Sequence, residues 1–161
     1  MNVPRGKRYQ TGLEDQLTEE GDMLADPTSA RLNRTTRPLR PRVFVIDDEP
    51  LLGQTLKLGL DDSCEVTLET SGEAARRRLL AGERFDLVLC DLGLPDLSGA
   101  EVYRDVVSAR PDLARTFVLI TGGAVTPEAR AFLEQHPGPQ LHKPFTLVEV
   151  ERLVQQLVSH G

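Results

Sequence analysis

Five polar side chains follow apolar stretches of the sequence, at positions where they could act together. They are three carboxylates, one hydroxyl and one ammonium group: Asp47, Asp48, Asp91, Thr121 and Lys143. Carboxylates packed together repel one another, so the cluster needs a compensating cation. Mg²⁺ prefers one or two carboxylates, a carbonyl and waters, and Lys143 would add a fixed positive charge. A carboxylate nucleophile, a metal ion, a cationic group and a hydroxyl donor together suit phosphoryl transfer.

Asp91 is the member of this set that a structural role explains least well. It ends the apolar run 87–90, which is typical of a strand buried on both faces. An acidic group there is costly unless a cation meets it. The others have simpler alternatives: Asp47 or Asp48 could cap the next helix, Thr121 could be an ordinary strand-end residue, and Lys143 could be solvated.

Strand and helix patterns alternate along the chain from residue 42. Apolar or alternating runs predict strands at 43–46, 64–68, 86–90, 116–121 and 140–142. Apolar spacings of three and four predict helices at 50–60, 71–80, 99–109, 127–135 and 147–158. Pro50 suits a first helical turn, Ser71 can cap the second helix, and Gly82 can end it. Five strands alternating with five helices predict a parallel α/β sheet covered on both faces, whose strand ends bring the polar residues to one edge.

Composition points to one globular domain. The chain has 161 residues, 39% of them apolar, with no stretch near the ~20 apolar residues of a membrane span. The N-terminus lacks the apolar core of a secretory signal, so we expect a cytoplasmic protein without membrane partners. Cys64 and Cys90 both fall in predicted strands without metal-ligand spacing, which predicts small core residues.

The first 41 residues differ from the rest. They have little apolar periodicity, which predicts a disordered or weakly helical extension over 1–41 before a domain at 42–161. Arginines gather in 31–42 and could dock on an acidic partner or nucleic acid. The prolines among them favour a solvated linker instead. The net charge is −6, and the acidic excess lies in 42–161, which disfavours nucleic-acid binding by the domain.

In combination, the motifs resemble the receiver domain of two-component response regulators, over about residues 42–158. Four segments carry the resemblance: Val43–Pro50, Asp86–Gly99, Leu119–Gly122 and Lys143–Phe145. It implies a flavodoxin-like doubly wound sheet of five strands in the order 2-1-3-4-5, with five helices. Parts of the chain are also similar to receivers at the C-termini of hybrid sensor kinases.

The resemblance also implies roles for the polar residues. Asp91 would be the phosphoacceptor, and Mg²⁺ would be held by Asp91, Asp47, Asp48 and the backbone carbonyl of Gly93. The Thr121 hydroxyl would hydrogen-bond the phosphoryl oxygens. By the same resemblance, Asp91 would take its phosphoryl group from a phosphohistidine.

The same resemblance implies that Lys143 pairs with the phosphate and that the Lys143–Pro144 peptide bond is cis. One departure stands out: Gln140 occupies the place where the family often has an aromatic residue that moves with the threonine. The outward signal near this strand could therefore differ. For His142, beside Lys143, we expect a surface or packing role.

The partners implied are a sensor histidine kinase or phosphotransfer protein as donor, and a downstream protein as recipient of the signal. The chain ends at Gly161, directly after the last predicted helix, so we expect output through that downstream protein. We expect a signalling module rather than an enzyme, apart from its own phosphoryl transfer and dephosphorylation. One alternative is a phosphorylation-independent adaptor on the same scaffold. An aspartyl phosphatase is disfavoured. Such enzymes have an Asp-x-Asp pattern at the end of the first strand, whereas Asp47 and Asp48 are adjacent in this chain.

Overall fold

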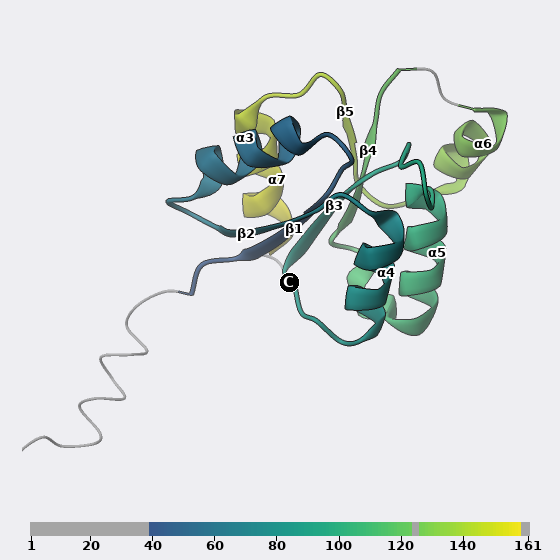
Figure 1. The fold of residues 1–161 in the computed structure, drawn as a ribbon, viewed down its shortest axis with the longest axis horizontal. Helices are drawn as coiled ribbons and strands as arrows, with labels where there is room; N and C mark the ends of the chain where they lie inside the picture. The colour runs from purple at the N-terminus through teal and green to yellow at the C-terminus, as the bar shows by residue number, and fades with distance from the viewer. Residues whose placement is uncertain (1–38, 124–125, 159–161) are drawn as a thin grey trace, which may run out of the picture. The chain divides into compact units, whose positions relative to one another are not determined.

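A five-stranded parallel sheet forms the centre of the computed structural model, which describes residues 39–123 and 126–158 (Figure 1). The strands are β1 (Arg42–Ile46), β2 (Glu65–Glu69), β3 (Leu87–Asp91), β4 (Phe117–Thr121) and β5 (Gln140–His142). Their order is β2-β1-β3-β4-β5, and each neighbouring pair is parallel. The predicted doubly wound fold and strand order are therefore confirmed.

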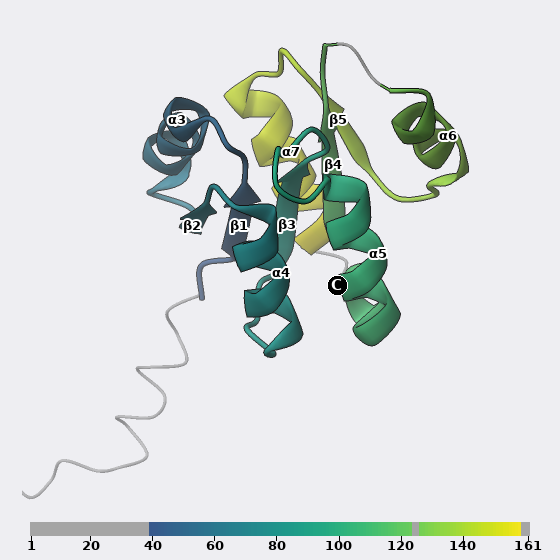
Figure 2. The ribbon, with the colours of Figure 1, turned by 45° about the vertical axis from the view of Figure 1, so that its right-hand side comes forward.

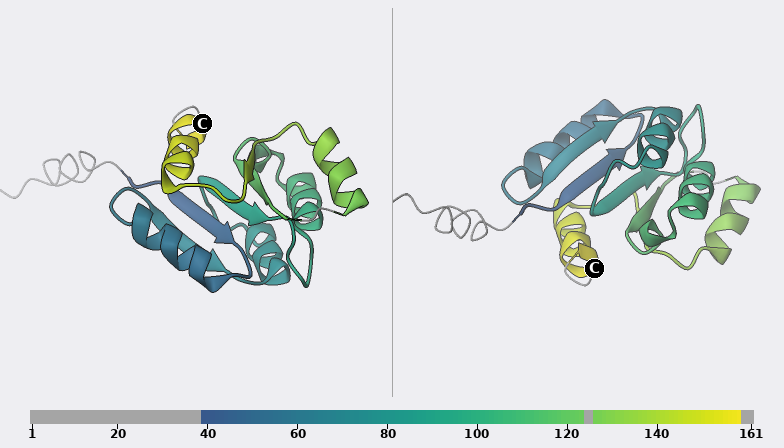
Figure 3. Two further views of the ribbon diagram at one scale, coloured as in Figure 1. Left: turned by 90° about the horizontal axis from the view of Figure 1, so that it is seen from above. Right: turned by 90° about the horizontal axis from the view of Figure 1, so that it is seen from below.

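Helices cover both faces of this sheet. In the described residues they are α3 (Pro50–Leu60), α4 (Gly72–Leu80), α5 (Gly99–Ala109), α6 (Pro127–Gln135) and α7 (Leu147–Val158). Strand side chains alternate between two cores, as the pleat requires. Phe44 and Phe117 pack toward α4, α5 and α6, whereas Val45 and Ile120 pack toward α3 and α7. Figures 2 and 3 show α4 beside α5 and the sheet lying between helices.

Local sequence signals set the helix ends. Pro50 is the first residue of α3, and the Ser71 hydroxyl accepts a hydrogen bond from the Ala74 N–H at 3.1 Å at the start of α4. Gly82 follows α4 with a φ of +98°, a conformation that glycine adopts without strain. These three predictions are confirmed. A reciprocal capping box between Ser98 and Glu101 begins α5, and so defines where the loop after β3 ends.

Some boundaries differ from the prediction. Strand β2 begins one residue later than predicted, so Cys64 precedes it, although both cysteines are buried as core residues. A short 3₁₀ helix at Pro111–Leu113 was not predicted; it forms because Pro111 ends α5 and suits a new tight turn, while Leu113 is buried. The Lys143–Pro144 peptide bond is cis, as the family resemblance implied.

The chain before the sheet is described only from residue 39. The predicted extension over 1–41 therefore lies mostly outside the described residues, as do the arginines at 31, 34 and 37. The compact unit that holds the sheet begins at Arg40, whose guanidinium donates to the carbonyls of Asp61 and Cys64 beyond α3. Among the helices described, none has the length and apolar character needed to cross a membrane.

Candidate functional site

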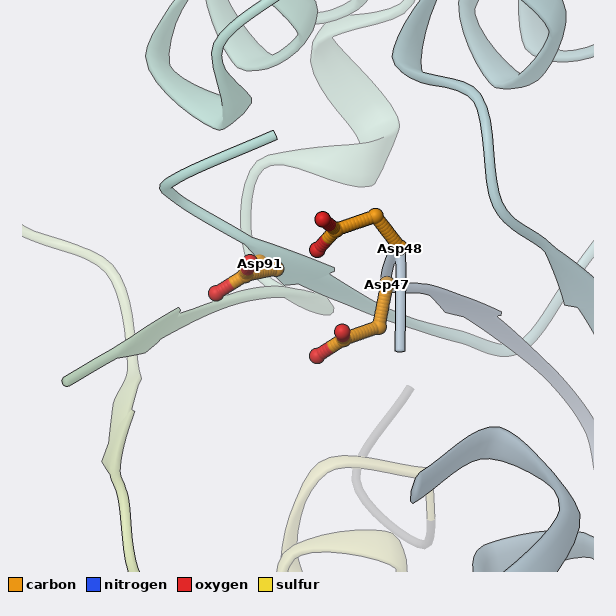
Figure 4. A group of neighbouring side chains, drawn as sticks. All are labelled: Asp47, Asp48 and Asp91. Carbon is orange, nitrogen blue, oxygen red and sulfur yellow. The ribbon is translucent and has the colours of Figure 1, made fainter. Parts of the chain in front are cut away.

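Three carboxylates meet at the carboxyl edge of the sheet. Asp47 and Asp48 directly follow β1, and Asp91 is the last residue of β3, the neighbouring strand. One carboxylate oxygen from each lies within 4.8 Å of the other two. Figure 4 shows the three side chains projecting from the two strand ends toward a common region. The adjacency of β1 and β3 thus brings together residues that are more than 40 positions apart in the sequence.

Lys143 supplies the nearest positive charge. It follows β5, and its Nζ lies 3.1 Å from Asp47 Oδ2 and 3.6 Å from Asp91 Oδ1. Burial by itself would lower the pKa of Lys143, but the contact with Asp47 and the charge of Asp91 raise it overall. Lys143 therefore remains a cation against the carboxylates. It also pairs with Glu49 Oε1 at 3.4 Å, a contact that the sequence patterns do not predict.

Burial and like charge act together on Asp91. The residue is buried, as is Asp47, whereas Asp48 is exposed. Burial, followed by the negative charge of Asp47, raises the pKa of Asp91, and the Lys143 ammonium opposes this shift. The site therefore holds more negative charge than one lysine compensates, which leaves it suited to an additional cation.

Asp47 has both a local and a tertiary role. Its Oδ1 accepts the Glu49 N–H at 2.9 Å, so the carboxylate supports the turn before α3. It does not cap the helix, because Glu49 is the N-cap residue and no side chain makes a capping bond there, so the simpler alternative is wrong for Asp47. Its Oδ2 is buried and faces Lys143 without hydrogen-bond geometry. A buried carboxylate oxygen with no hydrogen bond is costly. Together with the other two carboxylates it forms a hard oxygen donor set, which fits Mg²⁺.

The loop after β3 holds Asp91 closely on one side and leaves space on the other. A Cβ at Gly99 would lie 2.4 Å from the Asp91 carbonyl oxygen, so only glycine fits there. A Cβ at Gly93 would meet its nearest atom, Asp91 Oδ2, at 3.9 Å. Asp91 and Gly93 line a cavity of about 690 Å³ together with Asp48 and Lys143. The carboxylate is thus reachable from outside through this cavity.

Thr121 is at the same sheet edge, but its hydroxyl has a different partner. It is the last residue of β4, it is buried, and its Oγ1 lies 2.7 Å from Nδ1 of His142 in β5. His142 is exposed, in agreement with the predicted surface role, but its bond to Thr121 was missed. The signal for it is the strand register, which pairs the two residues and which no local pattern reveals.

Comparisons with known proteins match most of the chain to one domain family. The family model of the response regulator receiver domain matches residues 43–155. The response regulator protein PmrA of Pseudomonas aeruginosa is 32% identical over 117 residues, which are 72% of this chain and 52% of that protein. The sensor histidine kinase GacS of Pseudomonas protegens is 32% identical over 143 residues, covering 84% of this chain and 15% of that protein. The chain thus spans about half of PmrA and a smaller part of GacS.

A solved structure supports the fold. The receiver domain of the sensor histidine kinase PA1611 from Pseudomonas aeruginosa PAO1 aligns with a TM-score of 0.63 at 24% identity, over 75% of this chain and 99% of that chain. A magnesium ion is coordinated in the active-site cleft of that protein. At this level of identity, the likeness establishes the common fold.

Proposed function

Because the chain belongs to the response regulator receiver domain family, we propose that it accepts a phosphoryl group on Asp91 from a phosphohistidine in a two-component phosphorelay. The observation that carries the proposal is the position of Asp91. It is a buried carboxylate at the end of β3, with two further carboxylates and a lysine ammonium group around it and an open cavity beside it. A receiver domain is a signalling domain. The chemistry we propose for this chain is therefore limited to transfer of a phosphoryl group onto Asp91 and later hydrolysis of the phosphorylated residue.

The proposed transfer forms one bond and breaks one bond. An ionised Asp91 oxygen attacks phosphorus, the P–N bond to the donor imidazole breaks, and the departing nitrogen keeps the electron pair of that bond. Asp91 needs no general base because its carboxylate is already the nucleophile. Hydrolysis by water then returns the carboxylate and releases inorganic phosphate.

Lys143 and Thr121 have separate proposed roles. The Lys143 ammonium, 3.6 Å from Asp91 Oδ1, is placed to pair with a phosphoryl oxygen once Asp91 is phosphorylated. The pair between Lys143 and Asp91 is then replaced by a pair between Lys143 and the phosphoryl group. We assign the Thr121 hydroxyl to another phosphoryl oxygen as a hydrogen-bond donor.

Mg²⁺ is the cofactor that we propose. Asp47, Asp48, Asp91 and the Gly93 carbonyl would hold it, and the clustered carboxylates support this choice. When bound, the ion would neutralise the carboxylates and the negative charge of the transferring phosphoryl group.

We propose residues 42–161 as the receiver domain, with 1–41 as an extension, in a cytoplasmic protein. The donor is a sensor histidine kinase or a phosphotransfer protein, and a downstream protein distinguishes the phosphorylated from the unphosphorylated surface. The kinship with both PmrA and GacS supports a place in a two-component system.

The test is phosphorylation by a small donor. The purified chain is incubated with acetyl phosphate, with Mg²⁺ or with EDTA, and its intact mass is measured beside that of an Asp91→Asn variant. We expect a gain of one phosphoryl group that requires both Mg²⁺ and Asp91. A Glu101→Gln variant is the control for loss of a carboxylate at the capping box of α5, and should still be modified. Lack of modification of the wild-type chain, or equal modification of the Asp91→Asn variant, would refute the assignment.

A further inference from the structure

Thr121 and Asp91 line different cavities. Thr121 and His142 line a cavity with Arg130 and Leu133 of α6, whereas Asp91 lines the larger cavity with Asp48 and Gly93. The two cavities share Gly122 and Lys143 in their walls. To donate to a phosphoryl group on Asp91, the hydroxyl therefore has to turn from one cavity toward the other.

His142 is what holds the hydroxyl in its present place. Register pairs Thr121 with His142 across β4 and β5, and the Lys143 N–H donates to the Thr121 carbonyl at 2.7 Å, which fixes this register. The distance of 2.7 Å between Oγ1 and Nδ1 is that of a well-formed hydrogen bond. Among the described residues, no other group hydrogen-bonds this hydroxyl. Whichever of the two groups donates, the hydroxyl oxygen must leave Nδ1 before it can turn into the cavity beside Asp91.

Gln140, at the position where the family often has an aromatic residue, is engaged elsewhere. Its side-chain amide donates to the Leu133 carbonyl near the end of α6, at 3.4 Å. Of the described residues of β5, His142 is the one whose side chain bonds Thr121. Its ring is also exposed, so a change in its position alters the surface beside α6.

We propose that His142 is a positioning residue that holds the Thr121 hydroxyl in the unphosphorylated protein and releases it when Asp91 is phosphorylated. This inference rests on the proposed phosphorylation of Asp91. The Thr121–His142 hydrogen bond opposes phosphorylation because it must break before the hydroxyl can reach the phosphoryl group. The freed imidazole then carries the change to the exposed edge of β5, in place of a side chain at position 140.

The test measures binding of beryllofluoride, a phosphoryl mimic, in the presence of Mg²⁺ by titration calorimetry. His142→Leu removes the hydrogen-bond partner of the Thr121 hydroxyl and should bind beryllofluoride about two- to tenfold more tightly, the range for one lost hydrogen bond. His142→Asn places an amide oxygen near the position of Nδ1 and should bind like the wild type. In a Thr121→Ala background, the His142→Leu change should have no effect, because the hydrogen bond is already absent.

An independent readout uses the wild-type chain. The ¹⁵N resonance of His142 Nδ1 should shift when beryllofluoride binds, and this shift should be missing in Thr121→Ala. Unchanged affinity in His142→Leu, an equal gain in both backgrounds, or a constant Nδ1 resonance would each overturn the inference while leaving the proposed function intact. A wild-type chain that neither binds beryllofluoride nor accepts a phosphoryl group would overturn the proposed function, and this inference with it.

Discussion

An Asp91→Asn variant should be more stable than the wild-type chain when Mg²⁺ is absent. The carboxylate of Asp91 is buried beside Asp47, and both burial and that neighbouring charge raise its pKa. A raised pKa means that folding favours the protonated form, so the charge costs stability at any pH above the folded-state pKa. The variant should therefore lose its advantage as the pH falls below about 4, where the wild-type carboxyl is protonated in the unfolded chain as well.

Distances in the site set the magnitude. The carboxylate oxygens lie within 4.8 Å of one another, and at that distance a pair of like charges costs about 1 kcal/mol in water and about 3.5 kcal/mol at an effective dielectric constant of about 20. The attraction between Asp91 and Lys143 at 3.6 Å offsets about 1.2 to 4.6 kcal/mol over the same range. The Asp91→Asn change removes two repulsions, with Asp47 and Asp48, and one attraction, with Lys143. The free energy of unfolding should therefore increase by roughly 0.5–2.5 kcal/mol. For a domain of this size, that corresponds to a rise in melting temperature of about 2–8 °C.

Thermal denaturation followed by circular dichroism checks this value, first with EDTA and then with excess Mg²⁺. Magnesium should stabilise the wild type more than the variant because Asp91 is a proposed ligand. The stability advantage of the variant should therefore shrink or reverse when Mg²⁺ is present. Asp62→Asn, in the turn after α3, is the matched control for loss of one negative charge and should change little in either condition. A lower melting temperature for Asp91→Asn than for the wild type in EDTA would refute the electrostatic reasoning.

Three further outcomes follow from contacts outside the charge cluster. Gly99→Ala should destabilise the chain by about 1–3 kcal/mol in urea denaturation, because the new Cβ meets the backbone of Asp91. Gly93→Ala should have a stability within about 0.5 kcal/mol of the wild type, because space is free there. Similar losses of stability in the two variants would contradict the packing argument. Asp96→Ala should cost about 1 kcal/mol of unfolding free energy, since Asp96 accepts from two N–H groups in the first turn of α4; an unchanged urea midpoint would count against it. Burial lowers the pKa of His136, so the folded protein favours the neutral imidazole. The stability of the fold should therefore fall as the pH drops below about 6.5, the ordinary histidine pKa. A His136→Phe variant whose stability keeps the same pH dependence would disprove this cause.

Much of the fold follows from local patterns. Continuous apolar runs such as 87–90 are stable only between two layers of helices, and strands that alternate with helices must be parallel. This logic predicted the sheet, and it also predicted that residues after β1, β3 and β5 would meet at one edge. Asp47, Asp91 and Lys143 do lie together there, because all the strands are parallel and end at the same edge of the sheet.

Other parts of the site depend on distances that no local pattern contains. The bond between Thr121 and His142 depends on the register of β4 against β5, and a shift of one residue would turn His142 to the other face. The pair between Glu49 and Lys143 depends on how closely the loops after β1 and β5 approach each other. Neither contact is therefore predictable from the sequence patterns.

The sequence by itself determined which chemical groups stand at the sheet edge, because the length and polarity of each strand decide where it ends. It also determined the two covered faces, since alternating apolar residues can be buried only between layers. Only the tertiary structure decided how those groups are paired: Lys143 with Asp47, Asp91 and Glu49, and the Thr121 hydroxyl with His142. Pairing depends on register and on separations of a few ångströms, and these emerge only when all the elements pack together.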